Sequence, residues 1–172
     1  MGTKVAGTSG RFELRDDTIR MPDGTEYPYT VVGNPDSAFV VPLFANRDTM
    51  LVRQWRHAWD ESSWEVPAGT FDGDEDPLEC ARRELQEEAG LVAGRYTSLG
   101  VIHGAAFITG RAHLFLAEEI TESSRNPESY EQDMETLRLP FSEALQAALD
   151  GTIAHAGSIA ALARAARAQK LV

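Results

Sequence analysis

The sequence predicts a mixed α+β fold, and three of its features lead to that prediction. An amphipathic helix with clear start and stop signals lies near the middle of the chain, at residues 77–89. Short apolar runs typical of β-strands lie before and after it, and two further helices end the chain. With 172 residues, of which 42% are hydrophobic, the chain can form one domain with a buried core.

The N-terminal part of the chain, residues 11–33, predicts short strands joined by turns. We expect these strands to form a small β-lobe of their own, residues 1–36, ahead of a main domain at residues 37–172. The apolar positions are Phe12, Leu14, Ile19 and Met21, and the turn signal is Pro22-Asp23-Gly24.

The main domain begins with two apolar runs, residues 38–43 and 50–54, which predict the two strands of a hairpin. Asn46, Arg47 and Asp48 fit the turn between them. A short strand at 64–66 ends at Pro67. Further strands are expected at 97–102, 112–117 and 134–139, and helices at 142–149 and 157–168, with Gly151 between the helices.

The helix at 77–89 has strong signals at both ends. Asp76 suits the N-cap, Pro77 the first helical position and Glu79 the third position of a capping box. Gly90 suits a left-handed C-terminal cap. One buried stripe is expected, because apolar residues recur at spacings of three or four: Leu78, Ala81, Leu85 and Ala89.

The charge of the chain is strongly negative, at −11. Residues 69–91 and 118–135 each carry −6, so the acidity belongs to two short segments, for which solvated surfaces are one interpretation. Such a balance argues against a surface that binds nucleic acid. No apolar run is long enough to span a membrane, and the first ten residues lack the apolar stretch of a signal peptide. We therefore expect a cytoplasmic protein without nucleic-acid or membrane partners.

Three carboxylates of the central helix, Glu84, Glu87 and Glu88, project toward one side because they are three and four residues apart. Their mutual repulsion would be offset by a hard divalent cation, which prefers oxygen ligands. Arg83 can reach Glu87 at a spacing of four and hold its orientation. The alternative is a solvated helix face with acid–base pairs.

Residues 69–91 fill all nine fixed positions of the pattern Gly-x5-Glu-x7-Arg-Glu-U-x-Glu-Glu-x-Gly-U, where U is apolar. This pattern resembles the signature of the Nudix hydrolase family. The resemblance implies an α/β/α sandwich with a mixed sheet that binds Mg²⁺ or Mn²⁺ and hydrolyses a diphosphate by attack of water on phosphorus. It also implies the roles of individual residues. The metal ligands would be Glu84, Glu87, Glu88 and the carbonyl of Ala68, with Glu87 and Glu88 also catalytic, and the structural positions would be Gly69, Glu75, Arg83 and Gly90.

The segment before this motif resembles the ADP-ribose pyrophosphatase branch of the family, in the runs at residues 51–56 and 64–69. By that resemblance Arg56 and Arg53 would contact the substrate diphosphate, for which cationic forks are suited. Surface salt bridges are the alternative. Tyr29, Phe12 or Tyr27 of the lobe could stack on a base, or pack in the core. The resemblance further implies a homodimer, often with exchanged lobes.

A late loop in this branch supplies a carboxylate that acts as the base or completes metal binding. Glu131 is the first candidate here, followed by Asp133 and Glu135. Residues 104–111, which include Phe107 as a candidate substrate contact, lack the proline and acidic pair common in ADP-ribose enzymes. The resemblance implies a nucleoside diphosphate linked to a sugar, like ADP-ribose, as the substrate. The departure in this loop leaves another nucleotide sugar or a dinucleotide as the alternative.

A domain that senses a nucleotide without cleaving it is a further alternative to an enzyme. Such domains usually lose carboxylates of the motif, and this sequence keeps all of them. Of the remaining side chains, Cys80 is expected to pack rather than to act as a nucleophile. Trp55, Trp59 and Trp64 are expected in the core or in a dimer contact rather than as platforms for a base.

Overall fold

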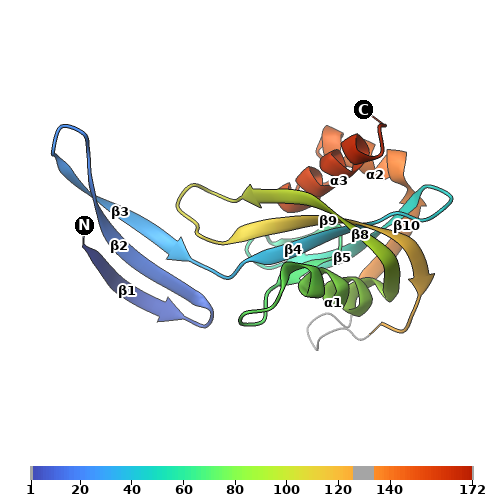
Figure 1. The fold of residues 1–172 in the computed structure, drawn as a ribbon, viewed down its shortest axis with the longest axis horizontal. Helices are drawn as coiled ribbons and strands as arrows, with labels where there is room; N and C mark the ends of the chain where they lie inside the picture. The colour runs from blue at the N-terminus through green and yellow to red at the C-terminus, as the bar shows by residue number, and fades with distance from the viewer. Residues whose placement is uncertain (1, 126–133, 172) are drawn as a thin grey trace.

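The computed structural model describes residues 2–125 and 134–171. Three β-sheets and three helices make up this part of the chain (Figure 1). The helices are α1 (Pro77–Ala89), α2 (Phe141–Asp150) and α3 (Ala156–Ala168). The strands are β1 (Thr3–Ser9), β2 (Phe12–Arg20), β3 (Glu26–Gly33), β4 (Ser37–Pro42), β5 (Asp48–Arg56), β6 (Glu61–Glu65), β7 (Ala68–Thr70), β8 (Leu91–His103), β9 (Arg111–Glu122) and β10 (Glu135–Pro140).

Strand β4 lies at the centre of the main domain. It pairs in parallel with β9 and antiparallel with β7, in a four-stranded sheet of order β7-β4-β9-β8. Its residues are apolar almost throughout, as expected of a strand that is covered on both faces. Because side chains alternate along a strand, Ala38 and Val40 pack with α1, whereas Phe39 and Val41 pack with α2 and α3.

The domain is therefore a sandwich of helix, sheet and helix. Figure 1 shows α1 on one side of the sheet and α2 with α3 on the other. A second sheet, of order β10-β5-β6, completes the body of the domain. The predicted α+β class, the α/β/α sandwich and the mixed sheet are confirmed.

Helix α1 has the bounds that the sequence predicts. The Asp76 carboxylate accepts a hydrogen bond from the Leu78 N–H, at 2.8 Å, and Pro77 opens the helix. Gly90 ends the helix in the left-handed conformation, at φ 66°. Ala81, Leu85 and Ala89 are buried as expected. The ends are correct because these signals act within one turn of helix.

The predicted hairpin of residues 38–43 and 50–54 is wrong. A tight turn does join β4 to β5, with the Phe44 N–H donating to the Asp48 carbonyl at 2.9 Å. The two strands then diverge into different sheets: β4 pairs with β7 and β9, and β5 pairs with β6 and β10. The turn is set locally, whereas the strand partners come from distant segments.

The first three strands form an antiparallel sheet of their own, of order β1-β2-β3. Figure 1 shows this sheet projecting from the body of the molecule. Strands β2 and β3 match the predicted lobe, but the sequence did not predict β1, whose seven residues are all exposed. The division of the chain after residue 36 into a lobe and a main domain stays a prediction.

The three helices described, 13, 10 and 13 residues long, are each shorter than an apolar helix must be to cross a bilayer.

Candidate active site

Helix α1 and strand β7 form the first wall of the candidate site. Glu84 and Glu88 lie on the face of the helix that meets β7, and both are almost fully buried. The Glu88 carboxylate accepts a hydrogen bond from the Ala68 N–H, at 2.8 Å. A buried carboxylate requires such partners, because burial removes its hydration. We call Glu84, Glu87 and Glu88 the acidic wall.

Gly69 is the position where the backbone of β7 comes closest to this wall. A Cβ atom at residue 69 would lie 1.7 Å from Oε1 of Glu84. No side chain fits there unless Glu84 moves, so the close approach requires glycine. This contact explains why the first position of the motif is occupied by glycine.

Arg83 connects the acidic wall to the loop before the helix. Its Nη1 donates to Glu84 at 2.6 Å and to Glu87 at 3.0 Å, as the spacing of four predicts for Glu87. Its Nε and Nη2 donate to Glu75 at 3.0 and 2.9 Å, and Nη2 also donates to the Thr70 carbonyl at 3.1 Å. The hydrogen bonds between Arg83 and Glu75 are the main cause of two pKa shifts. They lower the pKa of Glu75 and raise the pKa of Arg83. These contacts are the geometry expected of a brace between loop and helix.

The donors proposed for a metal ion are all oxygen atoms: the carboxylates of Glu84, Glu87 and Glu88 and the carbonyl of Ala68. Hard divalent cations such as Mg²⁺ and Mn²⁺ prefer such donors, so the chemistry of the set fits them. The Arg83 guanidinium lies within 3.0 Å of both Glu84 and Glu87, so the wall already gathers positive charge. Within residues 2–125 and 134–171, no three His, Cys, Asp or Glu side chains are grouped closely enough to hold an ion without rearrangement.

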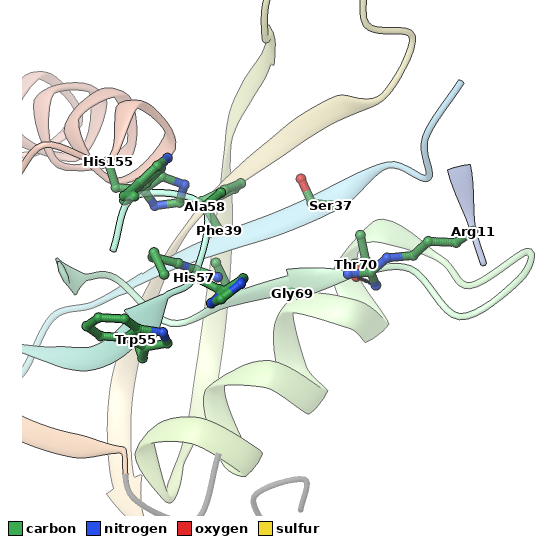
Figure 2. Close-up of a pocket in the computed structure, with 12 residues that line it drawn as sticks. Arg11, Ser37, Phe39, Trp55, His57, Ala58, Gly69, Thr70 and His155 are labelled. Atoms are coloured by element: carbon green, nitrogen blue, oxygen red, sulfur yellow. Dashed lines mark hydrogen bonds between the residues drawn. The ribbon is translucent and has the colours of Figure 1, made fainter. Parts of the chain in front are cut away.

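The second wall of the site lines a cavity of about 430 Å³ (Figure 2). Strand β7 borders this cavity and also contacts the acidic wall. Four basic side chains line it, and we call them the basic wall: Arg11, Arg56, His57 and His155. Among the described residues that line the cavity, none is Asp or Glu. In a chain with a net charge of −11, such a lining favours an anion. The other lining residues are Ser37, Phe39, Trp55, Ala58, Trp59, Ala68, Gly69 and Thr70.

Arg11 reaches this cavity from the N-terminal lobe. It lies in the turn between β1 and β2, and its guanidinium donates to the Thr70 hydroxyl of β7 (Figure 2). Arg11 was not predicted as a site residue, because 59 residues separate it from Thr70 and no sequence motif connects the two.

Arg56 is held by a buried carboxylate, Glu65 of β6. The Arg56 Nε and Nη2 donate to the two oxygens of Glu65 at 2.8 and 2.5 Å. His155, just before α3, approaches the same carboxylate at 2.7 Å through Nδ1. Burial alone would raise the pKa of Glu65, but the hydrogen bonds and charges of Arg56 and His155 outweigh it and hold the pKa at about 2. Glu65 therefore stays ionised at any ordinary pH.

Other predicted site residues lie away from the cavity. Arg53 pairs with Glu135 at 3.1 Å on an exposed surface. The Tyr29 hydroxyl lies 3.4 Å from the Ala106 carbonyl, in the loop that carries Phe107. Neither Tyr29 nor Phe107 is among the lining residues, so the structure brings these two regions together but not to the cavity. Glu131 and Asp133 lie outside the described residues. The roles of all these residues stay predictions.

Cys80 is fully buried under β4, where burial first of all, and then nearby carboxylates, raise its pKa to about 12. This agrees with a packing residue, because a nucleophilic cysteine needs a lowered pKa. Trp55 and Trp59 are 55% and 45% exposed, so the interpretation that they lie in the core is wrong. The alternative, a dimer contact, stays a prediction.

Comparison with known proteins decides the family. A family model described as the NUDIX domain matches residues 33–162. The chain belongs to this family. The matched range contains the acidic wall, β7 and most of the basic wall.

Curated relatives agree with this assignment. The chain is 34% identical to an ADP-ribose pyrophosphatase of Mycobacterium tuberculosis over 164 residues, which cover 93% of this chain and 79% of the relative. It is also 34% identical to a GDP-mannose pyrophosphatase of Salmonella arizonae over 116 residues, 62% of this chain and 60% of the relative.

A solved structure described as an ADP compounds hydrolase has the same fold. Its TM-score is 0.86 at 19% identity, and the match covers 100% of this chain and 95% of that one. These findings confirm the Nudix family, the resemblance to its ADP-ribose pyrophosphatase branch, and an enzyme of the pyrophosphatase type.

Proposed function

We propose that this Nudix hydrolase cleaves the diphosphate of a nucleoside diphosphate sugar to a nucleoside monophosphate and a sugar phosphate, with a divalent cation as cofactor. ADP-ribose is the first candidate substrate, since the relatives of this chain include an ADP-ribose pyrophosphatase. The observation that carries the proposal is the pair of walls on β7. One wall supplies carboxylates for a cation, and the other supplies basic groups for an anion.

In the proposed reaction, Glu84, Glu87, Glu88 and the Ala68 carbonyl hold Mg²⁺ or Mn²⁺. The bound ion would neutralise charge on the diphosphate and make water a stronger nucleophile. Gly69 lets the strand that carries Ala68 lie against Glu84, since a Cβ at residue 69 would overlap that carboxylate.

The basic wall orients the diphosphate in this scheme. Arg56, whose Nε and Nη2 are held by Glu65, places its positive charge at the surface of the cavity, where it would attract phosphate oxygens. A proton must leave the attacking water, and the late-loop carboxylate Glu131 is our candidate for the group that accepts it, with Asp133 and Glu135 as alternatives.

A different nucleotide sugar is the second candidate substrate. Two observations favour it: residues 104–111 lack the proline and acidic pair expected for ADP-ribose, and a GDP-mannose pyrophosphatase is also among the relatives. A dinucleotide, or binding of a nucleotide without cleavage, would fit the same two walls.

We also propose a homodimer in which the N-terminal lobe contributes to the interface. The lobe supports this proposal because six of its large apolar side chains are exposed: Val5, Phe12, Leu14, Met21, Tyr27 and Tyr29. An exposed set of this size suits a protein contact.

A substrate panel tests the proposed function. The protein is incubated with ADP-ribose, GDP-mannose, other nucleotide sugars and dinucleotides in H₂¹⁸O, with Mg²⁺, with Mn²⁺ or with EDTA, and the products are identified by mass spectrometry. We expect a nucleoside monophosphate and a sugar phosphate from at least one substrate, and none with EDTA. Folded protein that cleaves no member of the panel would contradict the proposal, and tight binding without turnover would favour a sensing domain.

A further inference from the structure

Glu65 lies at a junction that the Nudix motif does not include. It is 1% exposed, sits at the end of β6 and comes just before the segment that leads into β7. Both of its carboxylate oxygens are engaged by Arg56, and one of them also by His155. A fully buried carboxylate with this many charge-assisted contacts has one fixed orientation.

The first turn of α3 also contacts this junction, at the residue that follows Glu65. The Ser158 hydroxyl accepts a hydrogen bond from the Val66 N–H at 3.1 Å and lies 3.2 Å from Nδ1 of His155. The His155 ring packs against Phe39 and Trp59, with ring centroids 5.3 and 5.7 Å apart. Helix α3 is thus joined to the end of β6 by side chains more than 90 residues away in sequence.

Arg56 is the member of this group that faces the substrate in the proposed function. A long arginine side chain on a strand end has several rotamers, and fixing one of them costs conformational entropy. The bidentate contact with Glu65 fixes the guanidinium plane in one orientation at the cavity wall. The entropy of Arg56 is therefore already lost in the free protein, and substrate binding does not have to reduce it further.

We infer that Glu65 is a positioning residue for the diphosphate substrate: clamped by His155 and the first turn of α3, it aims Arg56 at the anion bound in the cavity. The C-terminal helix thereby takes part in substrate binding. This inference rests on the proposed function. Glu65 itself touches no reacting atom, and its effect passes through Arg56.

Kinetics of Glu65→Gln with the best substrate of the panel test the inference. The amide cannot accept both arms of the guanidinium, so we expect KM to rise at least about 10-fold while kcat stays within about threefold. Arg56→Ala should raise KM by a similar factor, and the double variant by no more than Arg56→Ala alone. Glu143→Gln is the control: Glu143 is an exposed carboxylate on α2, outside the cavity lining, and we expect wild-type KM. An unchanged KM in folded Glu65→Gln, or additive effects in the double variant, would overturn the inference.

A second pair of variants covers the case in which Glu65→Gln does not fold. His155→Asn keeps a side-chain N–H near the place of Nδ1, whereas His155→Leu has none. Both variants remove a basic group from the cavity wall, so we expect both to raise KM. The increase should be several-fold larger for Leu than for Asn, at equal kcat, because only Asn can still donate to Glu65. Equal KM values for the two variants would contradict the claim that His155 holds Glu65 in place.

An observation that needs no turnover separates this inference from the proposed function. In ¹⁵N-labelled protein, the Nε–H resonance of Arg56, identified by its loss in Arg56→Lys, should exchange slowly with solvent. We expect fast exchange in Glu65→Gln and slow exchange in Glu143→Gln. If the wild type cleaves no substrate, the proposed function fails but this resonance still reports the clamp; fast exchange in the wild type would overturn the clamp itself.

Discussion

The two walls of the site differ in how the chain builds them. The acidic wall comes from one helix, and the strand that it contacts is within 20 residues of it in sequence; its groups are fixed by local spacing and by Arg83. The basic wall gathers side chains from three separate places in the chain: Arg11, the adjacent Arg56 and His57, and His155. One wall is therefore a motif and the other a product of the tertiary fold. We expect changes in the first to affect chemistry and changes in the second to affect binding.

The largest expected effect belongs to the acidic wall. Glu88→Gln should lower kcat by about 100-fold or more, because it removes a charged donor for the cation, with little change in fold. Steady-state kinetics and circular dichroism measure the two quantities.

Glu79→Gln is the control for this change, since Glu79 lies on the same helix but exposed, paired with Arg82 at 3.1 Å. Full activity in Glu88→Gln would show that the acidic wall does not carry the chemistry.

Gly69→Ala probes the contact between the strand and the acidic wall. The new Cβ would overlap Glu84, so either the side chain or β7 must move. We expect a loss of stability of about 1–3 kcal/mol, typical of overpacking, together with at least a 10-fold loss of kcat. Thermal unfolding and kinetics measure both.

Gly104→Ala, where a Cβ meets nothing within 4 Å, serves as the control. Wild-type stability and kcat in Gly69→Ala would mean that Glu84 does not need its present position.

A smaller effect is expected on the free energy of unfolding at low pH. It comes from Glu65, which holds Arg56 and His155 of the basic wall. The pKa of Glu65 is about 2 in the folded protein and near 4.5 when unfolded, so the unfolded chain takes up its proton first as the pH falls. Stability from Glu65 is complete above about pH 4.5 and is lost between about pH 4.5 and 2, amounting to about 3 kcal/mol.

Urea unfolding of the wild type and of Glu65→Gln at pH 6 and pH 3 measures this effect. The difference in the free energy of unfolding between the two proteins should shrink at pH 3. An equal difference at both pH values would contradict the ionised clamp.

Local signals made the acidic wall predictable from sequence, and the same signals explain why α1 has the expected ends. Asp76, Pro77 and Gly90 act on their own turn of helix. The carboxylate spacing then places Glu84 and Glu88 on one face. Only the contact that explains Gly69 required the structure.

The basic wall was largely out of reach of the sequence. Arg56 was expected from its resemblance to the branch, but Glu65 and His155 are 90 residues apart and no spacing rule connects them. Strand β1 was missed for a related reason, since a strand without a buried face has no apolar pattern. The false hairpin of β4 and β5 came from a correct local turn between strands whose partners are distant.

The central claim is that the acidic wall binds the cation and that the basic wall does not. Binding of Mn²⁺, followed by electron paramagnetic resonance of the free ion, tests this claim most directly. We predict that the wild type and Arg56→Ala bind Mn²⁺ equally in the absence of nucleotide, whereas Glu88→Gln binds it at least about 10-fold more weakly. Equal binding by Glu88→Gln and the wild type, or no binding by the wild type, would contradict the account.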